Sequence, residues 1–71
     1  MTPTAAEKKA IEAFKVAIKL LPANCWLFAC EGGLAIMRRK GDGSRATTSS
    51  GSMDSEYTVD TLECDIDGGG W

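Results

Sequence analysis

Residues 25–39 read CWLFACEGGLAIMRR, two short apolar runs joined by a pair of glycines. Each run is too short for an ordinary helix, and the first is rich in aromatic residues, which favours a strand. Two adjacent glycines supply the positive φ angles that a tight hairpin turn needs. The segment therefore predicts a β-hairpin of residues 25–30 and 34–39, with Gly32 and Gly33 at its turn.

The two faces of this hairpin are both apolar. With the turn at Gly32 and Gly33, Ala29 lies opposite Ile36. Side chains alternate along a strand, so each face collects every second residue. One face would carry Leu27, Ala29, Leu34 and Ile36, and the other Trp26, Phe28, Ala35 and Met37. A single helix can cover only one of them. The other face is expected under the tail of the chain or against a partner, for example in a homodimer built on Trp26, Phe28 and Met37.

The segment before the hairpin has the signature of an amphipathic helix. Thr4 and Glu7 have the spacing of a capping box, in which each side chain bonds the backbone N–H of the other residue. Apolar residues then recur at helical spacing on one face: Ala10, Ile11, Phe14, Ala17, Ile18 and Leu21. Pro22 disfavours helical geometry at the residue before it. We therefore expect a helix over residues 4–20.

The segment after the hairpin predicts a loop and a third strand. Residues 41–56 are rich in Gly, Ser and Thr, which indicates a flexible loop. Residues 57–66 have strand composition, but their alternation changes phase, so we expect a bulge near Asp60 and Thr61. The chain is thus expected to form one domain over residues 1–71, of α+β class. One N-terminal amphipathic helix would pack on a three-stranded, mainly antiparallel sheet in the order α-β-β-β.

Composition argues against several kinds of function. The chain has 71 residues and no histidine, which removes the usual general base, and we expect no catalytic residues. Its three cysteines lack a fourth zinc ligand, and we expect neither metal nor cofactor. We expect no membrane span and no signal peptide. An odd number of cysteines without a secretory signal indicates reduced thiols and a cytoplasmic protein.

The charges are sorted along the chain. All eight basic residues lie between Lys8 and Arg45, whereas residues 46–71 contain six acidic side chains and no basic one. Glu63, Asp65 and Asp67 would form a line of anions about 6.6 Å apart on one strand face. This pattern predicts a surface for a protein partner with a basic, nucleic-acid-binding surface. The candidate partner-binding residues are Asp54, Glu56, Tyr57, Asp60, Glu63, Asp65, Asp67 and Trp71. Docking of the third strand beside Arg38 and Arg39 would neutralise part of this surface.

The basic residues support an alternative function, a small nucleic-acid-binding module. Its candidate residues are Lys15, Lys19, Arg38, Arg39, Lys40 and Arg45. The isoelectric point near 4.9 disfavours direct binding of nucleic acid. The segment around Gly41 and Gly43 also lacks the Lys and Ser/Thr of a phosphate-binding loop.

The short acidic chain resembles small phage-encoded anti-CRISPR inhibitor proteins. The features that carry the resemblance are the length, the acidic residues from Asp54 to Asp67 and the lack of catalytic motifs. The resemblance implies a non-enzymatic inhibitor that acts in the host bacterial cytoplasm. Such an inhibitor binds a CRISPR effector subunit, in some cases as a DNA mimic. It is a resemblance of class, so no site residue is carried over from it.

Overall fold

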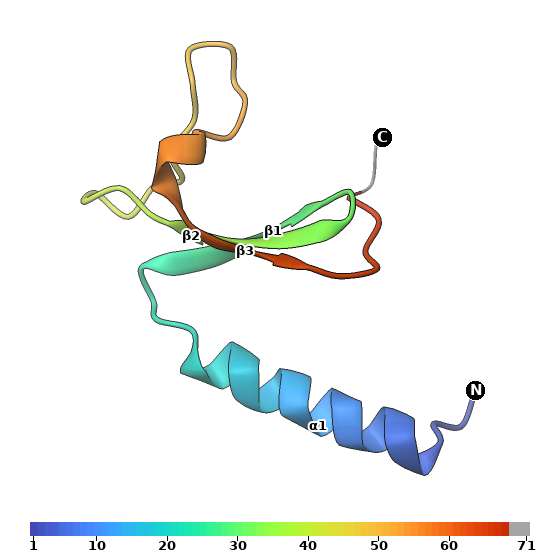
Figure 1. The fold of residues 1–71 in the computed structure, drawn as a ribbon. Coiled ribbons are helices and arrows are strands. Elements are labelled where there is room, and N and C mark those ends of the chain that lie inside the picture. Colours follow the sequence, from blue (N-terminus) through green and yellow to red (C-terminus); the bar gives the residue numbers. More distant parts are fainter. Residues whose placement is uncertain (69–71) are drawn as a thin grey trace.

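The structure, a computed structural model, describes residues 1–68 (Figure 1). Its elements are the helix α1 (Ala5–Leu20), the strands β1 (Cys25–Cys30) and β2 (Gly33–Arg38), the short 3₁₀ helix η1 (Ser55–Tyr57) and the strand β3 (Thr58–Glu63). The strands form an antiparallel sheet in the order β1-β2-β3. The predicted α+β class and the order α-β-β-β are confirmed.

Helix α1 begins and ends where the sequence predicts. The Thr4 hydroxyl accepts the N–H of Glu7 at 3.1 Å, and the Glu7 carboxylate accepts the N–H of Thr4 at 2.8 Å. Leu21, before Pro22, has extended geometry with φ −63° and ψ 123°, so the helix ends there. Across residues 1–68 the structure contains no helix that is both long enough and apolar enough to span a membrane.

The predicted hairpin is present, but its register differs from the prediction. Ala29 lies opposite Leu34 rather than Ile36, and the turn consists of Glu31 and Gly32. Gly32 has φ 77°, whereas Gly33 belongs to β2 and has no positive φ. A Cβ atom on Gly33 would lie 3.2 Å from Cγ2 of Thr61. The absence of a side chain at the second glycine therefore allows β3 to approach closely. Each side chain still lies on its predicted face of the sheet. The residue opposite it changes by two positions, and side chains two positions apart share a face.

Strand β3 is shorter than the predicted residues 57–66. Tyr57 belongs to η1, and the chain leaves the sheet after Glu63. The pairing with β2 is irregular where Thr58 faces Met37 and Asp60 faces Ile36, so Val59 is the extra residue of a bulge. The predicted bulge therefore exists, one or two residues before its expected place.

The core lies on the face of the sheet that carries Trp26 and Met37. Trp26 is 8% exposed and Met37 is fully buried, and Ala46 from the loop is buried as well. Met53 packs against the same cluster, and the loop is closed by a bridge between Thr47 and Met53. This apolar face therefore lies under the loop, whereas the sequence suggested the tail or a partner. Of the three residues proposed for a homodimer interface, Trp26 and Met37 are covered by the loop, whereas Phe28 is exposed.

The helix lies beside the other face of the sheet without packing on it, which differs from the expected contact. Every residue of α1 is exposed, and Phe14 keeps 67% of its surface in solvent. The radius of gyration is 14.4 Å, whereas a compact domain of this length has about 11 Å. The connection explains the separation: Cys25 N–H donates to the Pro22 carbonyl and Arg39 N–H to the Asn24 carbonyl. These bonds hold residues 22–24 at the end of the sheet, and Figure 1 shows α1 running away below it.

Candidate protein-binding surface

Four carboxylates lie at the end of the sheet that carries the hairpin turn. The Gly32 N–H donates to the Ile66 carbonyl at 2.9 Å, and the Cys64 N–H donates to the Gly32 carbonyl at 3.2 Å. These bonds hold residues 64–67 against the turn. A shallow hollow of about 380 Å³ lies between them, lined by Glu31, Gly32, Cys64, Asp65, Ile66 and Asp67. We call Glu31, Glu63, Asp65 and Asp67 the acidic tip.

The acidic tip is not the straight line of anions predicted from the sequence. Only Glu63 lies in β3, because the chain turns after it to bond Gly32. Asp65 and Asp67 lie on the turning segment, so the prediction of one strand face with regular spacing is wrong. Glu31 was missed as a member of the site. Two features could have indicated it. Glu31 directly precedes the two glycines of the turn, and antiparallel pairing of β2 with β3 brings the end of β3 beside that turn.

The other predicted partner-binding residues lie away from the acidic tip. Asp54 and Glu56 lie at the opposite end of the sheet, where the Asp54 carboxylate caps η1 by accepting the Glu56 N–H at 3.0 Å. Tyr57, half-buried, lines a hollow there with Arg38 and Glu56. Asp60 lies in the middle of β3, exposed. Trp71 lies outside the described residues, so the predicted set is divided along the sheet.

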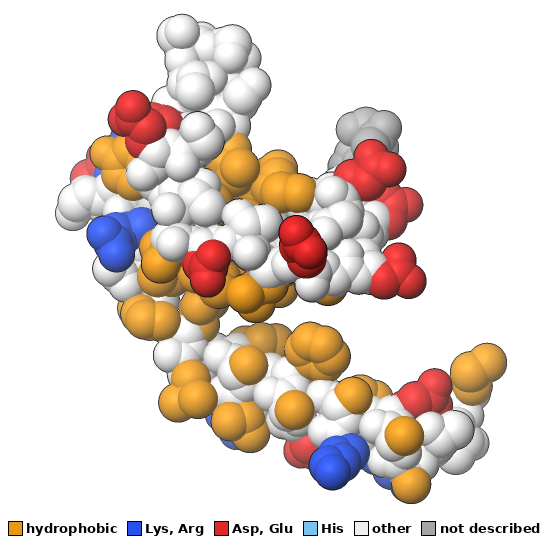
Figure 2. All heavy atoms as spheres, in the orientation of Figure 1, with side chains coloured by type: hydrophobic (Ala, Val, Ile, Leu, Met, Phe, Trp, Pro, Cys, Tyr) orange, Lys and Arg blue, Asp and Glu red, His pale blue; other side chains and the backbone are white. Residues whose placement is uncertain are grey.

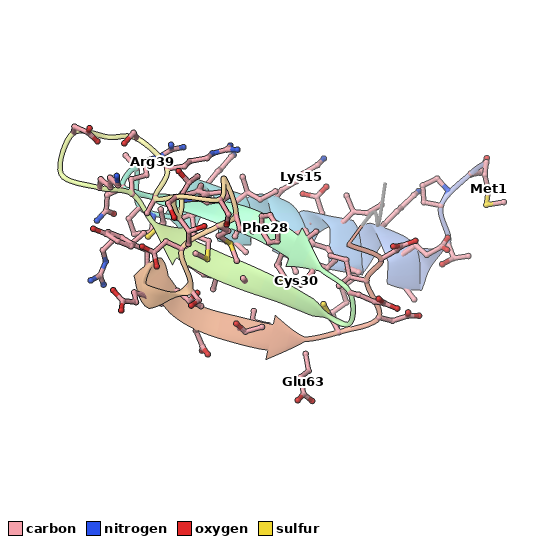
Figure 3. The ribbon with its side chains drawn as sticks, turned by 90° about the horizontal axis from the view of Figure 1, so that it is seen from above. Met1, Lys15, Phe28, Cys30, Arg39 and Glu63 are labelled. Atoms are coloured by element: carbon pink, nitrogen blue, oxygen red, sulfur yellow. The ribbon has the colours of Figure 1, made fainter. Side chains whose placement is uncertain are left out.

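The acidic tip is not neutralised by Arg38 and Arg39, although β3 does pair with β2. The register places Thr58 opposite Met37 and Glu63 opposite Gly33. Arg38 therefore lies at the far end of β2 from Glu63, and a strand of this length spans about 20 Å. Within residues 1–68 no Lys or Arg forms a salt bridge with Glu63. Figure 3 shows its side chain pointing away from the sheet, far from Arg39.

The predicted nucleic-acid-binding residues are divided as well. Lys15 and Lys19 lie on α1, where Lys15 Nζ lies 3.3 Å from the Glu12 carboxylate. Arg38, Arg39 and Lys40 lie at the end of the sheet opposite the acidic tip. The guanidinium of Arg45 lies 4.3 Å from the centre of the Trp26 ring, which gives it a role in covering the core.

The chemistry available at the acidic tip is electrostatic. Glu31, Glu63, Asp65 and Asp67 are all exposed, and Figure 2 shows acidic side chains gathered at this end of the molecule. In the described part of the chain, no three Cys, Asp or Glu side chains come together as a metal site requires. Exposed carboxylates in water attract cationic groups over roughly 8 Å at physiological salt. The surface is therefore suited to contact with a basic macromolecule.

Comparison of the chain with protein-family models, curated proteins and solved structures finds no match. Its function is therefore inferred from the charges and contacts described above.

Proposed function

We propose that this protein is a non-enzymatic inhibitor that binds another protein through its acidic tip. The observation that carries the proposal is the gathering of Glu31, Glu63, Asp65 and Asp67 at one end of the sheet. Glu31, Glu63 and Asp65 form no salt bridge within residues 1–68, so their charge is available to a partner. The basic residues of the sheet lie at its opposite end, which leaves the acidic tip locally anionic.

The partner in this proposal is a protein whose basic groove holds nucleic acid. Such a groove is lined with Lys and Arg that neutralise closely spaced phosphates. A cluster of carboxylates on a small rigid sheet offers the same groove an alternative set of anions. A CRISPR effector subunit has a surface of this kind, and it is the partner implied by the resemblance to anti-CRISPR inhibitors. Inhibition would follow from exclusion of the nucleic acid, with no reaction catalysed.

Displacement of DNA from purified CRISPR effector complexes tests this function. We expect the protein to release a labelled target duplex, and the release to weaken as salt is raised. Reversal of two tip charges, Glu63→Lys with Asp65→Lys, should weaken inhibition by at least about tenfold, because buried or closely approached charge pairs contribute strongly at interfaces. The control is Glu12→Lys with Glu56→Lys, which changes the net charge equally at sites away from the tip. Equal loss of inhibition in both variants would contradict the proposal.

The second candidate function is a nucleic-acid-binding module. The observation in its favour is the run of Arg38, Arg39 and Lys40 at the end of the sheet, where no carboxylate forms a salt bridge with these side chains within residues 1–68. A gel-shift series at low salt with duplex DNA and single-stranded RNA tests it. Binding that is lost in Arg38→Glu with Lys40→Glu, but kept in the tip variant, would favour this function over the first.

A further inference from the structure

Two apolar surfaces of this chain face solvent. On α1, Ile11, Phe14 and Ile18 are 42%, 67% and 62% exposed. On the sheet, the face turned away from the loop exposes Val59 and Leu62 by 50% and 48%. We call this the open face; it also carries Leu27, Leu34 and Ile36. Figure 2 shows apolar side chains on both sides of the gap between the helix and the sheet. A groove of about 530 Å³ lies where the two meet, lined in part by Ala17, Leu21 and Ile36.

The amount of exposed surface is too large for a compact monomer. The chain has a mass of 7.5 kDa and exposes 5762 Å². A folded monomer of this mass exposes about 4200 Å². The excess of about 1500 Å² per chain exceeds the roughly 800 Å² that each partner buries in a standard protein interface. An interface that covers α1 and the open face would therefore be large enough for a stable dimer.

The connection between helix and sheet works against closure of α1 on its own sheet. Residues 22–24 are held by the bonds from Cys25 to Pro22 and from Arg39 to Asn24, at 2.9 Å and 2.7 Å. Pro22 has a restricted φ angle, and Leu21 is extended. The helix is thus directed at an angle to the open face of its own sheet and diverges from it (Figure 1). A short, stiff connection of this kind favours exchange of an element between two copies.

The charges beside the two apolar surfaces are complementary. Lys15 borders the apolar stripe of α1, about 40° around the helix from Ile11, whereas Lys19 lies about 140° from Phe14. On β3, Asp60 lies opposite Ile36 and therefore on the open face, whereas Glu63 lies opposite Gly33 and points to the other face of the sheet. Within residues 1–68 of one chain, Lys15 and Asp60 form no salt bridge with each other, and Lys15 pairs with Glu12 instead. The lengths also agree, because α1 is about 24 Å long and a six-residue strand about 20 Å.

We propose that the occupant of the open face is α1 of a second copy of this chain. In the resulting twofold dimer, each helix packs its stripe on the partner's sheet, with Lys15 beside the partner's Asp60. Pairing of two β3 strands edge to edge is disfavoured, because Asp60 and Glu63 of one copy would lie near those of the other. Glu31 and Asp65 lie at the end of the sheet, outside this interface, so the dimer presents two acidic tips.

Sedimentation of the full chain across dilution tests the dimer. We expect the mass of a dimer in the micromolar range and of a monomer after sufficient dilution. Phe14→Glu should raise the dissociation constant by about a hundredfold, as for a central apolar anchor. The matched control is Val16→Glu, which removes another exposed apolar side chain of α1 about 160° away around the helix. It should change the constant only about threefold. A chain that is monomeric at every concentration, or equal effects of the two variants, would overturn the proposal.

A charge exchange identifies which surfaces meet. One variant carries Lys15→Glu, and the other Asp60→Lys. Each should dimerise at least about tenfold more weakly than the native chain, because like charges then meet at both contacts. In a mixture of the two, both contacts regain opposite charges, and a heterodimer with near-native affinity is expected. A mixture that associates no better than the separate variants would refute this arrangement. The measured quantity is mass, so the outcome is independent of any inhibition by the acidic tip.

Discussion

Replacement of Met37 by alanine should destabilise this protein more than any similar change on the open face. Met37 is fully buried between the sheet and the loop, in contact with the cluster around Trp26. Truncation of a buried Met costs about 2–5 kcal/mol, because apolar contacts are lost and a cavity remains. A domain of 71 residues has a free energy of unfolding of about 4–10 kcal/mol. The substitution should therefore remove roughly half of the total stability.

Urea unfolding followed by tryptophan fluorescence measures this loss. Trp71→Phe would be introduced throughout, so that Trp26 is the only tryptophan. With a denaturant slope of about 1.5 kcal/mol per molar urea, the midpoint should fall by about 2 M. The matched variant is Leu62→Ala on the open face, where a half-exposed side chain should cost about 1 kcal/mol. Nanomolar protein keeps self-association from adding to either value. If Met37→Ala lowered the midpoint no more than Leu62→Ala, the loop-covered face would not be the core.

Three smaller predictions follow from local contacts. Arg45→Ala should lower the free energy of unfolding by about 0.5–1 kcal/mol and shift Trp26 emission to the red, because the cation over the ring is lost. Unchanged emission would contradict this contact. The pKa of Asp42 lies below its ordinary value because its carboxylate accepts the Ser44 O–H and N–H. Its contribution to stability is therefore present above the ordinary pKa and is lost as pH falls through the lowered one. Ser44→Ala should raise this pKa toward about 3.9 in an NMR titration, and no rise would refute the bond's role. Thr4→Ala should reduce the stability of α1 by about 1 kcal/mol, because the cap is lost, and the helicity measured by circular dichroism should fall. Equal helicity would show that the cap contributes little.

The sequence was sufficient where structure depends on neighbouring residues. The capping box, the apolar stripe and Pro22 together fixed the bounds of α1, because each acts within one or two turns of the helix. The hairpin followed from two glycines between apolar runs. The register of the hairpin did not follow from the local sequence. The conformation of Gly33 depends on its contact with β3, which is more than twenty residues away in the sequence.

The parts that sequence reasoning missed depend on long-range contacts. The predicted line of anions assumed that β3 continues, whereas the bonds between residues 64–66 and Gly32 turn the chain at Glu63. The same bonds bring Asp65 beside Glu31, a pair that no local pattern relates. An apolar stripe on a helix indicates that the stripe is to be buried, but not which surface buries it. Phe14 belongs to such a stripe and remains exposed here.

The sheet converts the order of charges along the chain into a separation in space. In an antiparallel sheet of strand order β1-β2-β3, the start of β1, the end of β2 and the start of β3 share one end. The basic residues that follow β2 therefore lie opposite the acidic residues that follow β3. A basic groove would attract one end of such a molecule and repel the other, which orients the approach as well as accelerating it. Placement of the interface between copies along the length of the sheet, as we propose, leaves both ends accessible. Association and partner binding would then be separable. The tip variant, Glu63→Lys with Asp65→Lys, should lose inhibition but still form the dimer. Adding Phe14→Glu to it should weaken that dimer as much as it weakens the native one.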